Sequence, residues 1–183
     1  MRRTAAAGAG ALTAVTVLAA SLAGCGGGSE EDRAVPEKLC GTPVPAGLSK
    51  PLLEPYGKIT ESSRVDRQKP QTAPCVVAVD GERALAFRFA WHPGAPEDLL
   101  ATARQSSVVG LTDPARVNLG FEDSVLGNEG ATATTACRTQ AGDHFTLTVI
   151  VSRAAKDKAD LRPAVERFMR TYMAETVKTL NCA

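Results

Sequence analysis

The sequence predicts an α+β fold in which an antiparallel sheet of about five to six strands packs against a long C-terminal helix and one or two short helices. Large apolar side chains recur at every second position over residues 83–91 and 144–153, which is the period of half-buried strands. Over residues 160–180 they recur instead at helical spacing. The strand segments run together and the helices stand apart from them, which favours α+β over a parallel α/β sheet.

The first predicted hairpin joins residues 75–79 to residues 83–91. Asp80-Gly81 between them suits the positive φ angles of a tight hairpin turn. One face of the second strand carries the large apolar side chains Leu85, Phe87, Phe89 and Trp91. The other face carries Ala84, Ala86, Arg88 and Ala90. We interpret the aromatic face as part of the core, and the alternative is that it forms the wall of a ligand-binding site.

Further strands are predicted over residues 58–64, 115–122, 131–139 and 144–153. A glycine-containing segment, residues 126–130, is expected to connect the second and third of these. The last strand has a face on which every side chain is large and apolar, formed by Phe145, Leu147, Val149 and Val151. This face should also belong to the core.

Two short helices are expected before the C-terminal one. The first spans residues 46–54, where Pro51 should be tolerated only in a first turn because proline lacks an amide donor. The second runs from residue 96 to about residue 106. Glu97 and Asp98 would lie in its first turn, where the helix dipole favours acids.

The long C-terminal helix is predicted over residues 160–180. Asp160 can cap its start, and Pro163 falls in the first turn, where no amide donor is missed. Its stripe of methionine and aromatic side chains is interpreted as a core face and not as a cofactor site.

The cysteines predict two disulfides, since four of the five remain once Cys25 is set aside. Four cysteines allow three pairings, and we predict Cys40–Cys75 and Cys137–Cys182. The first would tie a proline-broken segment to the hairpin. The second would tie the C-terminal helix to a strand whose neighbouring alanines let a helix approach closely. The alternative is four reduced, buried cysteines.

The N-terminus predicts an exported lipoprotein. Residues 1–24 contain two early arginines and an uncharged apolar stretch over residues 5–20, which is the layout of a secretory signal peptide. Leu22-Ala23-Gly24-Cys25 resembles the lipobox of bacterial lipoproteins, which implies that Cys25 becomes the lipidated first residue of the mature protein. The alternative is an ordinary signal peptide with an incidental Cys25. We expect Sec export in preference to the twin-arginine route.

The mature chain is then expected to divide into two parts. Residues 25–38 would be a lipidated, glycine-rich and acidic tether, and residues 39–183 a single α+β extracytoplasmic domain. Two acyl chains on Cys25 give stable anchoring without a membrane-crossing segment. The predicted location is the outer side of the cell membrane, and the predicted partner there is membrane lipid.

The net charge and the motifs of the sequence argue against several classes of function. The signal peptide holds two of the 21 basic residues and none of the 20 acidic ones, so the mature chain is close to neutral. A neutral chain without a basic face argues against nucleic acid as a partner. The sequence shows no Gly-x-Ser-x-Gly elbow, phosphate loop or Cys-x-x-Cys pair, so we expect no metal and no cofactor.

The two histidines, His92 and His144, each fall at the end of a predicted strand. We therefore expect a non-enzymatic ligand- or partner-binding module of the cell envelope. The alternative is an envelope hydrolase that uses His92 or His144 with a nearby carboxylate.

The whole layout is similar to a known group of proteins. A lipobox, a tether, Cys40 before a short helix, Cys75 opening a hairpin, Cys137 in a late strand and Cys182 after an amphipathic helix resemble small actinobacterial, Streptomyces-type lipoproteins of unknown function. Those proteins are commonly related to the PsbP-like α/β sandwich. The resemblance implies a fold and carries no functional residues.

Overall fold

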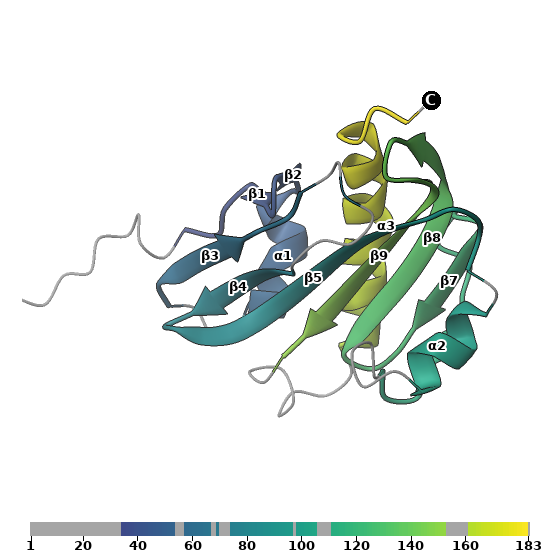
Figure 1. Ribbon diagram of the computed structural model, residues 1–183. Coiled ribbons are helices and arrows are strands. Elements are labelled where there is room, and N and C mark those ends of the chain that lie inside the picture. The colour runs from purple at the N-terminus through teal and green to yellow at the C-terminus, as the bar shows by residue number, and fades with distance from the viewer. Residues whose placement is uncertain are drawn as a thin grey trace, which may run out of the picture.

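The molecule is built on one seven-stranded antiparallel sheet with a two-stranded sheet beside it (Figure 1). The structure, a computed structural model, describes residues 34–53, 57–66, 69, 74–96, 98–105, 111–152 and 161–182. The main sheet has the strand order β3-β4-β5-β9-β8-β7-β6. Cys25 and the predicted signal peptide lie outside the described residues.

The main sheet consists of β3 (Ile59–Ser63), β4 (Cys75–Val79), β5 (Glu82–His92), β6 (Ala115–Arg116), β7 (Asp123–Leu126), β8 (Gly130–Thr139) and β9 (Gly142–Val151). The small sheet pairs β1 (Lys38–Leu39) with β2 (Thr42–Pro43). The helices are α1 (Ala46–Leu53), α2 (Leu99–Gln105) and α3 (Arg162–Lys178). None of the helices in these described ranges combines the length and apolar character needed to cross a membrane.

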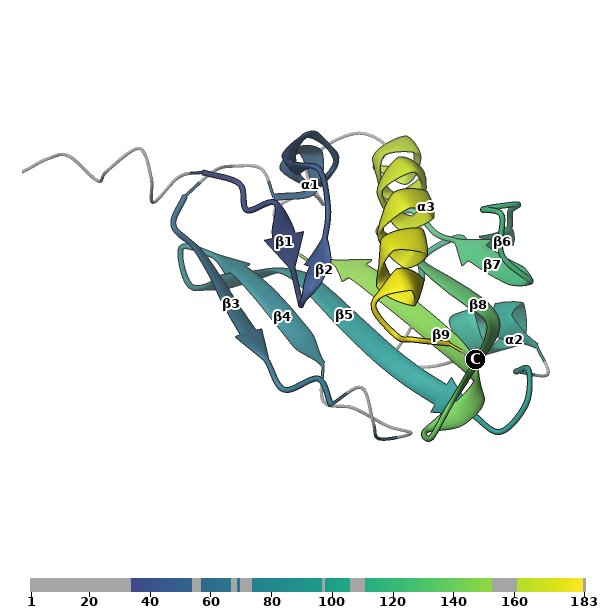
Figure 2. The same ribbon diagram turned by 90° about the horizontal axis from the view of Figure 1, so that it is seen from above.

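One face of the sheet, called here the core face, is covered by α1, α3 and the β1–β2 hairpin (Figure 2). The large residues of β5 and β9 predicted to be core are buried there. The ring of Phe87 lies 4.9 Å from Tyr172 and 6.1 Å from Phe168, both on α3. The interpretation of the aromatic stripe as core is therefore confirmed, as is that of the methionine and aromatic stripe of α3.

The expected fold class is confirmed, with more strands than the five to six predicted. The difference arises at residues 115–122, which were expected to form one strand. The chain instead leaves β6 at Arg116 and turns at Gly120, where φ is +88° and the Asn118 side chain accepts the Gly120 amide. It returns as β7, so part of the expected connection is itself a strand.

The β1–β2 hairpin is a second element that the sequence pattern did not predict. Cys40 and Gly41 occupy its turn with φ angles of 51° and 82°. The Cys40 amide donates a hydrogen bond to the Glu61 carboxylate of β3 at 2.7 Å. The predicted turn at Asp80-Gly81 shows the same positive φ angles, 52° and 81°, which confirms the first hairpin.

The short helices differ from the prediction in detail. Pro51 lies in the last turn of α1 and not in its first. The carbonyl that its missing amide would have bonded belongs to Gly47, an exposed residue. Helix α2 begins at Leu99, later than expected. Asp98 is therefore its N-terminal cap and not part of its first turn, and its carboxylate accepts the Ala101 amide at 3.0 Å. Glu97 lies outside the described residues.

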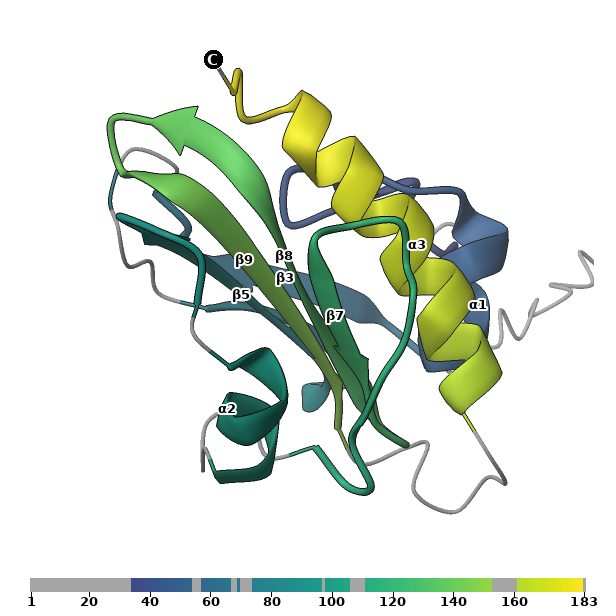
Figure 3. The same cartoon turned by 90° about the vertical axis from the view of Figure 1, so that its right-hand side faces the viewer.

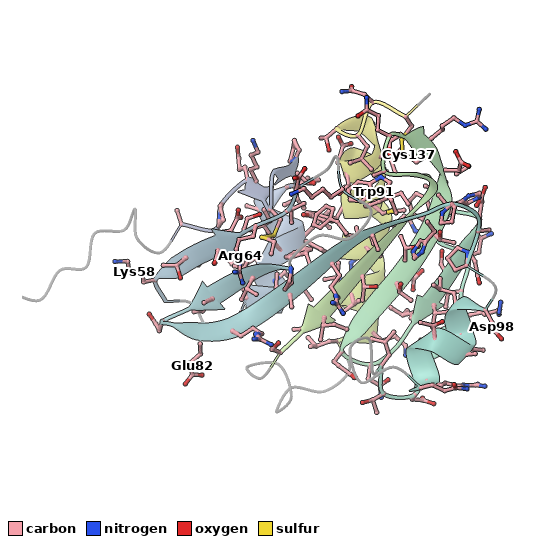
Figure 4. The ribbon with its side chains drawn as sticks, in the orientation of Figure 1. Lys58, Arg64, Glu82, Trp91, Asp98 and Cys137 are labelled. Carbon is pink, nitrogen blue, oxygen red and sulfur yellow. A yellow bond between two sulfur atoms is a disulfide. The ribbon has the colours of Figure 1, made fainter. Side chains whose placement is uncertain are left out.

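The C-terminal helix is confirmed, with Pro163 in its first turn. Leu161 is the capping residue and makes no side-chain cap, while Asp160 lies outside the described residues. Both predicted disulfides are present, Cys40–Cys75 and Cys137–Cys182, with Cα atoms 5.9 and 4.8 Å apart. Cys137 lies near the C-terminal end of α3 (Figure 4). Both bridges therefore tie elements of the core-face layer to the main sheet.

Candidate functional site

The opposite side of the sheet, called here the open face, carries one short helix. Helices α2 and α3 lie on opposite sides of the sheet (Figure 3). Between α2 and the strands lies a pocket of about 360 Å³, called here the α2 pocket. It is lined by Arg88–His92 of β5, Thr132 of β8, Thr146 and Thr148 of β9, and Pro96, Leu99 and Thr102 at the α2 side.

Strand alternation and register build the floor of the α2 pocket. The residues of β5 that point away from the core are Arg88, Ala90 and His92, and they lie opposite Thr148, Thr146 and His144 of β9. Thr148 in turn lies opposite Thr132 of β8. The side chains of Phe89 and Trp91 belong to the core face. Three strands that are neighbours in space but not in sequence thus contribute one continuous surface.

Threonine hydroxyls on this surface bond to one another. Thr132 Oγ1 and Thr148 Oγ1 lie 2.9 Å apart. Thr146 Oγ1 donates to Thr134 Oγ1 at 3.1 Å, and Thr134 Oγ1 donates to the Phe145 carbonyl at 3.1 Å. All four threonines are buried, so these bonds satisfy groups that would otherwise destabilise the fold. The threonine part of the floor is therefore polar without being charged.

Helix α2 is held over the floor by a small apolar cluster and a salt bridge. Leu99 and Ala103 pack with Leu111 and Val125, separately from the main core. Arg116 of β6 places one guanidinium nitrogen 2.9 Å from Asp98 and the other 3.3 Å from Asp123. Asp98 lies at the start of α2, at the edge of the molecule (Figure 4).

These bonds also affect the charge of Asp98. Its hydrogen bonds to the Ala101 amide and to Arg116 hold the pKa of its carboxyl below the usual value. Asp98 is therefore a charged carboxylate at neutral pH, and it is engaged with Arg116.

Arg88 and His92 are the ionisable side chains among the residues that line the α2 pocket. Burial first, and the neighbouring His144 second, lower the pKa of His92 below its ordinary value of 6.5. His92 is therefore mostly neutral at pH 7. Arg88 keeps its charge under all physiological conditions. The described lining of the α2 pocket thus carries one positive charge at neutral pH.

The structure brings the two predicted histidines together. His92 and His144 are cross-strand partners, and His144 Nε2 lies 3.3 Å from a Glu122 carboxylate oxygen. His144 Nδ1 is buried without a hydrogen-bond partner. Within the part of the chain that the structure describes, no hydroxyl group hydrogen-bonds to either histidine. The arrangement is a histidine–carboxylate pair without a bonded nucleophile.

Cys40, Cys75 and Glu61 lie together, and their side chains are of types that can bind metal ions. Cys40, Cys75 and Glu61 place their ligand atoms within 4.8 Å of one another. Both sulfurs are used in the disulfide, and the Glu61 carboxylate accepts the Cys40 amide. The cluster therefore serves to hold the β1–β2 turn against the sheet.

The α2 pocket was not predicted from the sequence, although several of its lining residues lie in strands that were predicted. The alternation in β5 places Arg88 and Ala90 on the face opposite the aromatic residues, and the sequence pattern assigned no role to this face. Comparison with protein-family models, with curated proteins and with solved structures finds no match for this chain. The site must therefore be interpreted from its own geometry.

Proposed function

We propose that this chain is a lipid-anchored extracytoplasmic module that binds a small molecule in the α2 pocket. The observation that carries the proposal is the pocket itself. Its volume of about 360 Å³ falls within the range of small-molecule sites, roughly 300 to 1,000 Å³. A few polar groups, Arg88, His92 and the threonines, converge on it beside the apolar Ala90 and Leu99.

The support for the pocket is rigid. Strands β5, β8 and β9 each have ten or eleven residues, and their other face belongs to the core that α1 and α3 cover. Such a floor changes shape little when a ligand enters, so little ordering entropy opposes binding. Helix α2 is fixed at its start by the Asp98–Arg116 pair.

A pocket-filling substitution tests the proposal. Ala90 lies between Arg88 and His92 on the floor, so Ala90→Leu should fill the pocket. Ala86 lies on the same face of the same strand and does not line the pocket, which makes Ala86→Leu the matched control. Each protein would be purified from its own membrane and its bound small molecules identified by mass spectrometry.

We expect a molecule that accompanies the wild type and Ala86→Leu and is missing from Ala90→Leu. The same recovery from all three proteins would refute binding at this place.

The anchoring part of the proposal rests on the sequence around Cys25. Support comes from the Leu-Ala-Gly-Cys lipobox and from the two disulfides, which suit an oxidising compartment. The kinship proposed with PsbP-like lipoproteins rests on the same layout. Metabolic labelling with a fatty-acid analogue should mark the wild type and leave Cys25→Ser unlabelled. A labelled Cys25→Ser protein would contradict the anchor.

The alternative function is an envelope hydrolase that uses His92 or His144. The contact between His144 and Glu122 favours it, because an acid that orients a histidine is part of many hydrolytic sites. A hydrolase screen of the wild type and of His144→Gln separates the two functions. An activity lost in the variant would support the enzyme, and an activity unchanged in the variant would not come from this histidine.

A further inference from the structure

The geometry points to the chemical class of the ligand in the α2 pocket: a small organic acid with a single negative charge, whose carboxylate pairs with Arg88. This inference rests on the proposed function and deepens it. It stands on three observations, which concern Arg88, the remaining charges near the pocket and the shape of the floor.

Arg88 differs from the other arginines in the described ranges. Only Arg88 and Arg162 are half-buried there, and the rest are exposed. Arg162 bonds to the Asn128 side chain and the Leu126 carbonyl and lies 3.6 Å from an Asp113 carboxylate oxygen. Arg88 has no hydrogen bond or ion pair with any described residue, although it lines the pocket. A partly desolvated guanidinium without a partner favours an anion, and its planar fork matches a carboxylate.

No described residue that lines the pocket can neutralise this charge. The lining contains Arg88, His92, threonines and apolar residues, without a carboxylate. Asp98, which directly precedes the lining residue Leu99, is paired with Arg116. One unpaired cation beside a neutral histidine suits one negative charge, whereas a dianionic group calls for further donors or cations.

The shape of the floor suits a compact acid with an apolar body. Arg88 and His92 are four residues apart on one strand, which places their Cα atoms roughly 13 Å apart. Ala90 lies between them and Leu99 lies on the α2 side, so the middle of the pocket is apolar. Thr102, Thr146 and Thr148 line the same path, and their hydroxyls are hydrogen-bonded within the protein. The volume is at the low end for small-molecule sites, which favours a compact ligand.

The test compares acids with amides of the same shape. A panel of small carboxylates, among them benzoate, phenylacetate and hexanoate, would be paired with the corresponding primary amides. Binding to the lipidated protein in nanodiscs would be measured by saturation-transfer NMR, with empty nanodiscs subtracted. The variants are Arg88→Gln, Ala90→Leu and, as a control for net charge, Arg83→Gln, an exposed residue of β5 away from the pocket.

We expect the wild type and Arg83→Gln to bind the acids about tenfold more tightly than the amides, the magnitude of one charge-assisted contact. Arg88→Gln should lose this preference, and Ala90→Leu should lose binding altogether. Equal affinity for acids and amides, or a preference that survives Arg88→Gln, would overturn the assignment of an acid while leaving a small-molecule site. Binding unaffected by Ala90→Leu, or no binding from either series, would overturn the pocket function itself.

Discussion

The two faces of the sheet use the same strands for different purposes. On the core face, β5 and β9 present phenylalanine, leucine, valine and tryptophan side chains to α3, and both disulfides tie elements of this layer to the sheet. On the open face, the same strands present threonine, alanine, arginine and histidine, and a small apolar cluster holds α2. The core-face layer therefore supplies most of the stability, so that side chains of the open face need not close the α2 pocket.

The threonines of the open face satisfy one another's hydrogen bonds. The bonds among Thr132, Thr134, Thr146 and Thr148 leave the floor intact whether or not a ligand is present. A pocket floored by unpaired buried hydroxyls would destabilise the empty protein. Four measurements test the difference between the two faces.

The largest difference in the free energy of unfolding is expected between substitutions of two adjacent residues of β5, Phe87 and Arg88, which point to opposite faces. Phe87→Ala removes a ring packed against Phe168 and Tyr172 and should lower the free energy of unfolding by about 3–5 kcal/mol. Arg88→Ala should change it by less than about 1 kcal/mol, because Arg88 has no described partner to lose. Urea denaturation followed by circular dichroism measures both. Comparable losses in the two variants would mean that the open face also carries the fold.

Removal of a disulfide should have the next largest effect. Replacing Cys137 and Cys182 by alanine opens a link across 45 residues and should lower the free energy of unfolding by about 3–4 kcal/mol. The matched variant without Cys40 and Cys75 opens a link across 35 residues, so its entropic loss should be nearly equal.

Both variants should still bind acids more tightly than amides at the α2 pocket, since neither bridge touches the open face. A disulfide variant that folds but no longer binds would show that the faces are coupled. Peptide mapping without reduction checks the pairing, and a Cys40–Cys137 peptide would contradict it.

Two threonine pairs, one on each side of the sheet, should give smaller and unequal effects. Thr176 Oγ1 of α3 lies 3.0 Å from Thr42 Oγ1 of β2 within the core-face layer, and both residues are fully buried. Thr176→Val should lower the free energy of unfolding by about 1–3 kcal/mol. Thr132→Val should lower it by less than about 1 kcal/mol, because water in the pocket can reach Thr148. Equal losses in urea denaturation would mean that the pocket is as dry as the core.

The smallest effect is expected from the titration of His92. Its pKa is lowered in the folded protein, so the unfolded chain binds a proton more readily. Its contribution to stability is complete above about pH 6.5 and decreases as the pH falls toward the folded pKa.

His92→Gln should therefore flatten the fall in melting temperature between pH 7 and pH 5, while Arg83→Gln should leave it as steep as in the wild type. Differential scanning calorimetry across this range measures the slope. An unchanged slope in His92→Gln would assign the pH dependence to other groups.

Local patterns in the sequence were sufficient for most of the fold. The alternation from Leu85 to Trp91 and from Phe145 to Val151 identified the core face, because side-chain direction in a strand depends only on the position along it. Asp80-Gly81 identified a hairpin for an equally local reason. The hairpin of β6 and β7 was missed because Asn118 and Gly120 lie inside a stretch that otherwise suits a strand.

The candidate site was decided by the tertiary structure. Arg88, Thr148 and Thr132 come from three separate strands, and they lie in one row because β9 pairs with both β5 and β8. The same register places His92 opposite His144, which the sequence could place only at two strand ends. Strand order, register and the position of α2 depend on contacts between distant segments. The composition of each face could therefore be predicted from the sequence, whereas the pocket on one of them could not.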